Sequence, residues 1–280
     1  MTHRRRLSWL AALLLAAIAL PATSAAAATR VEFASLDQDH PFRLSGMLYL
    51  PQGAPAPSPA IVLIHGSAGI DARGAYYRGP LLAAGVAVLE VDFKTGNFSS
   101  PSNRPPIEDF VPAAFAALRQ LRQSPAIDPA RVGVMGFSMG GGITVRTALE
   151  DNRKRWLGAE PGFAAHVAFY PVCRYLLPKV EHGSGVTGAP MIVFYGSADV
   201  YGDGTAVPEL KALLQRKFRF ELTTVEYPGA AHGFNLDAPP LSYPDPAAKG
   251  GRGYMAYDAA ATADSLPRVL AFVRQSLAVK

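Results

Sequence analysis

The sequence predicts an α/β protein with a mostly parallel, doubly wound sheet and helices on both of its faces. Three observations support this: apolar runs of strand length recur along the 280 residues, helical patterns alternate with them, and no internal repeat or domain-sized linker interrupts the series. Runs rich in Val and Ile are typical of strands buried on both faces of a parallel sheet. Because strand and helix alternate, right-handed crossovers would place helices on both faces. We therefore expect a single domain over residues 29–280.

The strands are predicted in order along the chain. Alternating apolar residues at 31–36 and 43–50 predict an opening antiparallel pair, and the Pro-rich segment 51–59 predicts a surface loop. The continuous apolar runs predict the remaining strands at 60–65, 86–91, 131–137, 163–170, 191–195 and 218–227.

Helical patterns lie between these runs, at 75–84, 107–122, 139–150, 208–216 and 257–277. Pro267 falls inside the last of them, where a proline can kink a helix. Two further segments, 174–189 and 235–253, are rich in Gly, Pro and polar residues. We expect both to be excursions from the sheet that shape the rim of a pocket.

Residues 1–28 have the pattern of a secretory signal peptide. Three arginines at 4–6 precede an apolar run at 10–20, and small residues end the segment, which places cleavage near Ala28. A single membrane anchor is the alternative, but the apolar run is short for a bilayer. We expect an exported protein, periplasmic or secreted, without stable membrane insertion after cleavage.

Composition argues against several other classes of function. The formal net charge of +5 falls to about +2 without the signal peptide, and the mature chain has no run of basic residues, so we expect no nucleic-acid surface. The lone Cys173 cannot form an intramolecular disulfide and is expected to be a buried small hydrophobe. The sequence shows no ligand cluster that would suggest a metal or an organic cofactor, and it does not fix the oligomeric state.

The most informative motif is Gly136-Phe137-Ser138-Met139-Gly140, which follows an apolar run and opens a helical pattern. Such a Gly-x-Ser-x-Gly turn exposes its serine above the edge of a sheet, and the glycines allow close approach of neighbouring backbone. Ser138 is therefore the candidate nucleophile. The alternative is a serine that only caps a helix in a glycine-rich turn.

A serine nucleophile needs a base, and the base needs an orienting acid. Asp199 follows the run at 191–195 and is the candidate acid, with Asp203 as a second candidate; a turn or capping role is the alternative. His232 follows the run at 218–227 between small residues and is the candidate base. The other histidines of the mature chain are less well placed, and His166, inside an apolar run, is expected to be a satisfied core residue.

The oxyanion of an acyl-transfer intermediate requires preorganised donors. The backbone N–H of Met139, at the start of the elbow helix, is one candidate. The second is the backbone N–H of Ser67 in the loop after the run at 60–65, with Ala68 as the alternative. His65 is expected to brace this loop rather than to take part in the chemistry.

With Gly-Phe-Ser-Met-Gly-Gly, Gly-Ser-Ala-Asp and Ala-His-Gly-Phe in place, the chain resembles the dienelactone hydrolase family of α/β hydrolases over residues 31–277. The resemblance implies the α/β-hydrolase fold, and it gives the catalytic roles to Ser138, Asp199 and His232 and the oxyanion donors to Met139 and Ser67. Three positions depart from the family pattern: Ser138 stands in place of Cys, His65-Gly66 in place of Glu, and Leu236 where an Arg would hold a carboxylate. These departures argue against the name-giving reaction.

The expected function is an exported serine hydrolase that cleaves carboxylic esters or lactones of small molecules through an acyl-enzyme. One alternative is a peptidase or amidase on the same scaffold, although peptidases of this type usually carry a large additional domain. The other is a non-catalytic binding module, although such proteins usually lose a member of the triad.

Overall fold

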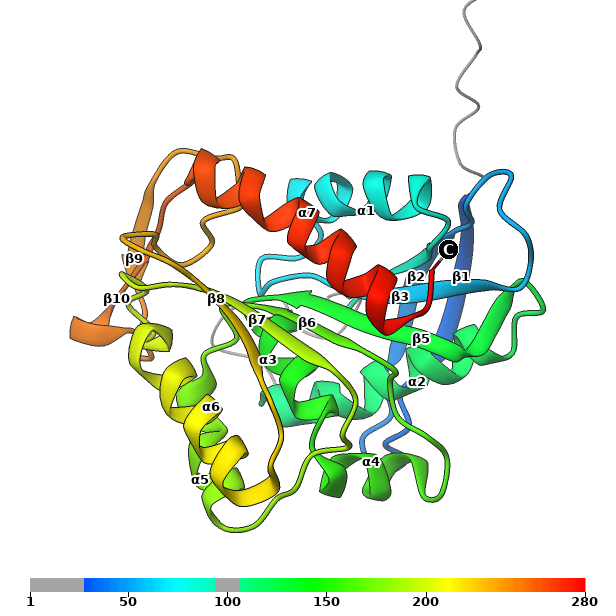
Figure 1. The fold of residues 1–280 in the computed structure, drawn as a ribbon, viewed down its shortest axis with the longest axis horizontal. Helices are drawn as coiled ribbons and strands as arrows, with labels where there is room; N and C mark the ends of the chain where they lie inside the picture. The colour runs from blue at the N-terminus through cyan, green and yellow to red at the C-terminus, as the bar shows by residue number, and fades with distance from the viewer. Residues whose placement is uncertain (1–27, 94–105, 280) are drawn as a thin grey trace, which may run out of the picture.

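The computed structural model describes residues 28–93 and 106–279, so the predicted signal peptide, except for Ala28, lies outside the described residues. An eight-stranded sheet forms the centre of the molecule, with strand order β1-β2-β4-β3-β5-β6-β7-β8 (Figure 1). Its strands are β1 (Ala28–Ala34), β2 (Arg43–Tyr49), β3 (Ser58–Ile64), β4 (Ala87–Asp92), β5 (Ile127–Phe137), β6 (His166–Phe169), β7 (Met191–Gly196) and β8 (Thr223–Tyr227). The pairs β1–β2 and β2–β4 are antiparallel and all others are parallel, which confirms the predicted mostly parallel sheet.

Helices cover both faces of this sheet (Figure 1). One face carries α1 (Ala72–Ala83) and α7 (Ala259–Ser276). The other carries α2 (Val111–Arg122), α3 (Met139–Thr147), α4 (Glu150–Leu157), α5 (Leu177–Glu181) and α6 (Asp203–Phe218), with short 3₁₀ turns η2 (Ile107–Phe110), η3 (Cys173–Tyr175) and η4 (Lys249–Gly251) in the connections. Within residues 28–93 and 106–279, no helix is long and apolar enough to span a membrane.

Strand β3 shows why the sheet is buried on both faces. Its side chains alternate: Ile61 and Leu63 pack with α1 and α7, whereas Val62 and Ile64 pack with α2. All seven residues of β3 are buried. Each such aliphatic side chain contributes about 1.5–3 kcal/mol when it leaves water, so the continuous apolar runs of the sequence stabilise a sheet covered on both sides.

Several predicted boundaries were wrong. The run at 218–227 begins in α6, because Phe218 is the last residue of that helix, and β8 starts only at Thr223. The helix predicted at 139–150 is two helices, α3 and α4, because the backbone at Leu149 is extended. The last predicted helix is confirmed as α7, which contains Pro267; this residue is exposed, so the carbonyl oxygen that loses its partner can bond to water.

Two buried side chains bear on other predictions from the sequence. Cys173 is fully buried, as predicted, and burial raises the pKa of its thiol well above the usual value. His166 is also fully buried; neither of its ring nitrogens makes a hydrogen bond of normal geometry within the described part of the chain, although backbone groups of Pro190 and Thr147 lie close enough to favour its protonated form. The prediction of a satisfied core histidine was therefore wrong, and burial lowers the pKa of His166 to about 4.

The excursion predicted at 235–253 contains a second, small sheet. Strands β9 (Leu241–Pro244) and β10 (Arg252–Met255) pair as an antiparallel hairpin. An isolated bridge joins the backbone of Met255 to that of His232, so the hairpin is attached to the loop after β8.

Candidate active site

Ser138 occupies a strained turn between β5 and α3. Its backbone has φ 52° and ψ −112°, a conformation that costs a non-glycine residue about 1–3 kcal/mol. The turn is tight: a Cβ at Gly136 would lie 2.2 Å from the carbonyl oxygen of Gly140, and one at Gly140 would lie 2.3 Å from that of Ile64. The glycines of the motif are therefore required by close backbone contacts, as the sequence predicted.

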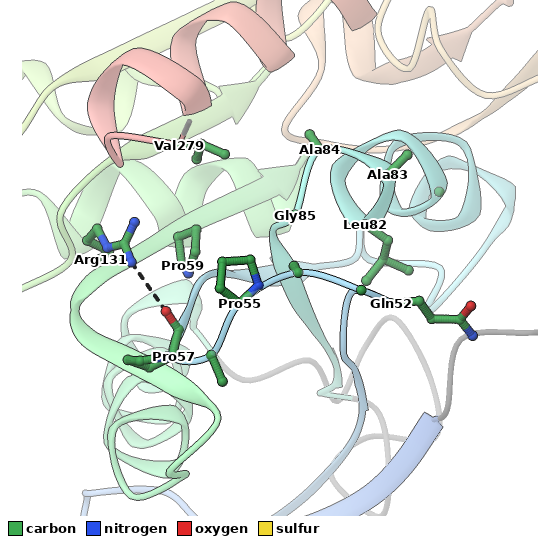
Figure 2. A pocket seen from close by; sticks show the side chains of 14 residues that line it. Gln52, Pro55, Pro57, Pro59, Leu82, Ala83, Ala84, Gly85, Arg131 and Val279 are labelled. Carbon is green, nitrogen blue, oxygen red and sulfur yellow. Dashed lines mark hydrogen bonds between the residues drawn. The ribbon is translucent and has the colours of Figure 1, made fainter.

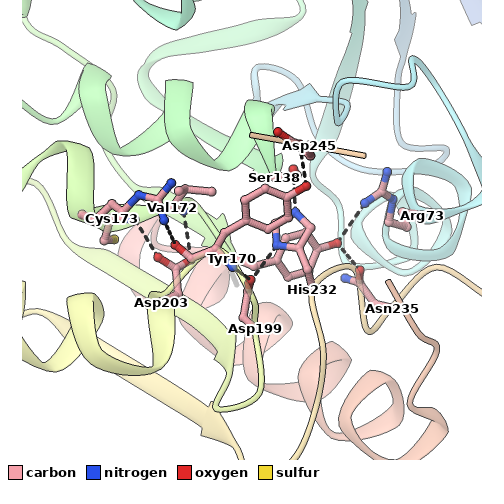
Figure 3. A network of polar contacts seen from close by, with 12 residues as sticks. Arg73, Ser138, Tyr170, Val172, Cys173, Asp199, Asp203, His232, Asn235 and Asp245 are labelled. Atoms are coloured by element: carbon pink, nitrogen blue, oxygen red, sulfur yellow. Dashed lines mark hydrogen bonds and ion pairs between the residues drawn. The ribbon is translucent and has the colours of Figure 1, made fainter. Parts of the chain in front are cut away.

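Three loops at the carboxyl ends of β5, β7 and β8 bring Ser138, Asp199 and His232 together (Figure 3). His232 Nε2 lies 2.7 Å from Ser138 Oγ, and His232 Nδ1 lies 2.7 Å from Asp199 Oδ2. The other carboxylate oxygen of Asp199 accepts a hydrogen bond from the backbone N–H of Tyr201 at 2.8 Å. The side chains of His232 and Asp199 are 3% and 0% exposed, so solvent has little access to their hydrogen bond.

Two tyrosine rings enclose the imidazole of His232. The Tyr170 ring lies 4.7 Å from it at an interplanar angle of 62°, and the Tyr201 ring lies 4.6 Å from it at 56°. These contacts restrict rotation of the imidazole, which already bonds at both nitrogens.

Asp203, the second candidate acid, makes different contacts. Its carboxylate accepts the backbone N–H groups of Val172 and Cys173 at 2.9 and 2.6 Å. It therefore holds the turn after β6 and does not bond to His232. Burial, together with the nearby charge of Asp199, raises the pKa of Asp203 to about 7.

The two candidate oxyanion donors face the same pocket as Ser138 and His232. Met139 is the first residue of α3, so its N–H has no partner within the helix. Ser67 lies in a turn closed by a hydrogen bond from Gly69 N to Gly66 O at 3.0 Å. The chain thus places one helix-terminal and one turn N–H at the edge of the pocket.

His65 braces the turn that carries Ser67. Its Nε2 accepts the backbone N–H of Phe93 at 2.9 Å, so its Nδ1 carries the proton and donates to the carbonyl oxygen of Gly66 at 2.6 Å. The ring therefore braces its own loop, as the sequence predicted, and also links it to the loop that follows β4.

The pocket beside Ser138 has a volume of about 600 Å³. Ser138 and His232 line it, and both predicted excursions contribute to the rim through Tyr175, Leu241, Tyr243, Asp245 and Ala247. The Tyr201 hydroxyl lies 2.7 Å from Asp245 Oδ2 and 2.8 Å from the Tyr243 hydroxyl. The excursions therefore shape the pocket rim, as predicted.

A larger hollow of about 1120 Å³ lies beside the Pro-rich loop before β3 (Figure 2). Its titratable lining residue is Arg131, whose guanidinium bonds to Asp128 and to the carbonyl oxygens of Pro57 and Ala278. Since its described lining provides no nucleophile or base, we place the chemistry in the smaller pocket.

Sequence reasoning missed three buried polar residues beside the triad, Arg73, Tyr170 and Asn235. Asn235 follows His232 by three positions, which is a weak local signal. Arg73 and Tyr170 lie 97 positions apart and carry no recognisable spacing.

Comparisons with known proteins agree with this fold. The sequence matches the Dienelactone hydrolase family over residues 44–277. An uncharacterized protein of Mycobacterium tuberculosis is 27% identical over 199 residues, which are 68% of each chain. Esterase FrsA of Photorhabdus laumondii is 33% identical over 114 residues, which are 40% of this chain and 26% of that protein.

Solved structures show the same fold at low identity. Esterase 2 of Thermogutta terrifontis, phosphorylated by paraoxon, has a TM-score of 0.62 at 17% identity and covers 89% of this chain and 94% of its own. A dienelactone hydrolase-like promiscuous phosphotriesterase from metagenomic libraries has a TM-score of 0.62 at 20% identity. This match covers 89% of the present chain and 99% of the phosphotriesterase chain. The chain belongs to the dienelactone hydrolase family of α/β hydrolases and is a serine hydrolase that acts on ester bonds.

Proposed function

We propose that the chain is an exported hydrolase of small-molecule carboxylic esters or lactones, with Ser138 as nucleophile, His232 as general base and Asp199 as the orienting acid. The observation that carries the proposal is the pair of 2.7 Å hydrogen bonds that runs from Ser138 through His232 to Asp199 at the wall of a pocket.

The reaction follows from this geometry. Ser138 Oγ attacks the ester carbonyl carbon while His232 Nε2 takes the hydroxyl proton, and the backbone N–H groups of Met139 and Ser67 donate to the oxyanion. His232 then protonates the departing alcohol, which leaves an acyl group on Ser138. Water attacks the acyl carbonyl with His232 again as base. Asp199 stays ionised and stabilises the imidazolium throughout.

The pocket favours small, largely apolar substrates. Its volume of about 600 Å³ lies within the usual range for small-molecule sites, and Met139, Val172, Leu241 and Met255 offer apolar surface. Arg146 also lines the pocket, but its guanidinium bonds to Glu108 and to the carbonyl oxygen of Gly142. With Leu236 in place of the family's arginine, we expect uncharged esters to be preferred over carboxylated lactones.

The test is hydrolysis of p-nitrophenyl esters from acetate to octanoate by the mature protein and by Ser138→Ala. We expect the substitution to lower kcat by about 10⁴-fold or more, and paraoxon to phosphorylate Ser138 in the wild type alone. Equal rates in the two proteins would refute the serine mechanism. Faster turnover of a matched p-nitroanilide than of the ester would favour an amidase.

Export is supported by the basic start, apolar run and small-residue end of residues 1–28. Expression of the full chain in a bacterial host, followed by mass spectrometry of the product, is expected to show a mature N-terminus near Ala28 in the periplasmic or culture fraction. A retained N-terminus in the cytoplasmic fraction would refute export and leave the catalytic proposal standing.

A further inference from the structure

A chain of buried polar side chains lies beside the triad (Figure 3). Arg73, near the start of α1, is 2% exposed and directs its Nε toward both carboxylate oxygens of Asp71, the N-cap of that helix. Arg73 Nη1 donates to the Tyr170 hydroxyl at 3.0 Å, and this hydroxyl donates to Asn235 Oδ1. Asn235 Nδ2 in turn donates to the Tyr77 hydroxyl at 3.0 Å.

The guanidinium of Arg73 also touches two other parts of the site. It lies 5.3 Å from the ring centre of Phe137, the residue directly before Ser138. A Cβ at Gly66 would lie 2.9 Å from Arg73 Nη2, so the guanidinium packs against the turn that carries Ser67. One buried cation therefore contacts both the nucleophile elbow and the candidate oxyanion turn.

Tyr170 transmits this contact to the base. Its ring packs against His232, and its backbone is held at φ 38°, a conformation that persists in a non-glycine residue only when the surroundings fix it. Burial raises the pKa of Tyr170 to about 12, so the hydroxyl stays protonated and can donate to Asn235. The hydrogen bonds of its hydroxyl with Arg73 and Asn235 restrain the ring in its position against the imidazole.

Burial of a cation carries a desolvation cost in free energy, and apolar side chains of similar volume often stabilise a core as well or better. This network joins the elbow, the oxyanion turn and the loop of the base, whose relative positions determine the rate of acyl transfer. We propose that Arg73 is a positioning residue of the hydrolase site, which acts on His232 through the hydroxyl of Tyr170. This inference rests on the proposed function.

Tyr170→Phe tests the proposal, because it keeps the ring against His232 and removes only the hydroxyl. A small displacement of reacting groups costs up to about 100-fold in rate. We expect kcat for p-nitrophenyl butyrate to fall about 10- to 100-fold while KM stays within about twofold. We also expect the acid limb of kcat/KM to move to lower pH, because a freer imidazolium is held less well against Asp199.

Tyr227→Phe is the matched control. The Tyr227 ring packs on Phe234 at 5.0 Å, much as the Tyr170 ring does at 5.3 Å, but its hydroxyl bonds to the partly exposed Asp264. We expect this variant to keep kcat within about twofold and to leave the pH profile unchanged. Titration of active sites with paraoxon normalises each kcat to the folded fraction.

Arg73→Lys tests the contact between Arg73 and Tyr170 from the side of the arginine, because lysine keeps the charge but lacks the guanidinium fork. If Arg73 acts through Tyr170, the double variant Arg73→Lys/Tyr170→Phe is no slower than the slower single variant. Additive losses would overturn this route of action.

Failure of the inference can be told apart from failure of the proposed function. A wild type without esterase activity would reject the function. With an active wild type, a Tyr170→Phe variant with unchanged kcat and pH profile would reject the inference alone. The downfield proton resonance of the His232–Asp199 hydrogen bond needs no substrate: a shift in Tyr170→Phe but not in Tyr227→Phe supports the inference, and an unshifted resonance overturns it.

Discussion

Acid should destabilise this protein through His166, a buried histidine in the middle of the sheet. Its ring makes no hydrogen bond of normal geometry among the described residues, and burial lowers its pKa from 6.5 to about 4. Between these values the unfolded chain binds a proton that the folded chain does not, so stability is complete above pH 6.5 and falls as the pH drops toward 4. At 1.36 kcal/mol per pH unit, the loss approaches about 3 kcal/mol.

The Asp203 carboxyl has the opposite effect on the pH dependence of stability. Its pKa is raised from 3.8 to about 7, so the folded chain binds the extra proton, and this contribution to stability increases as the pH falls from 7 toward 4. The two effects overlap, and the pH dependence of the wild type alone would not separate them. A variant without the imidazole separates them, because Asp203 contributes equally to both proteins.

The assay is urea unfolding of wild type and His166→Phe at several pH values from 4 to 7. We expect the free energy of unfolding of the wild type, relative to the variant, to fall by about 3 kcal/mol over this range. The absolute stability of the variant does not matter, because only the change in the difference with pH is used. Parallel curves would refute the reasoning and would mean that His166 binds its proton equally in both states.

Three further substitutions have defined outcomes. Asp199→Asn is expected to lower kcat about 10⁴-fold with little change in KM, because the amide holds the wrong imidazole tautomer; steady-state kinetics with p-nitrophenyl butyrate would contradict this if activity stayed within tenfold. His65→Ala removes the side chain that links Gly66 to Phe93, and we expect it to displace the Ser67 N–H. This should lower kcat by up to about 100-fold without loss of paraoxon labelling. Full activity would show that the link is dispensable. Leu241→Ala shortens an exposed side chain of the pocket rim. It should raise KM for the octanoate ester about fivefold, for about 1 kcal/mol of lost contact, and leave KM for the acetate ester unchanged. An equal change for both esters would show that the acyl chain does not contact Leu241.

The fold could be predicted from the sequence because its central strands, such as β3 and β7, are buried on both faces and therefore appear as unbroken apolar runs. The boundary at Phe218 could not, since an apolar residue at the end of a helix and one at the start of a strand look alike in a linear pattern. The break between α3 and α4 at Leu149 was missed for a related reason: no glycine or proline marks it in the sequence.

Candidate residues of the site were found to the extent that their signal is local. Ser138, Asp199 and His232 each follow an apolar run within a short motif, and the structure brings them within hydrogen-bond distance. The contact between Arg73 and Tyr170 depends on how α1 packs against the end of β6, which only the tertiary structure determines. The missing hydrogen bonds of His166 are likewise a property of packing.

The isolated bridge between Met255 and His232 ties the rim hairpin to the loop of the candidate base at one backbone position. We therefore expect substrate selection and proton transfer by the proposed base to be coupled in this chain. A β9–β10 hairpin grafted from a relative would therefore change the position of His232 as well as the shape of the pocket rim. In this family member, exchange of specificity by loop replacement must preserve the pairing at Met255 if turnover is to be kept.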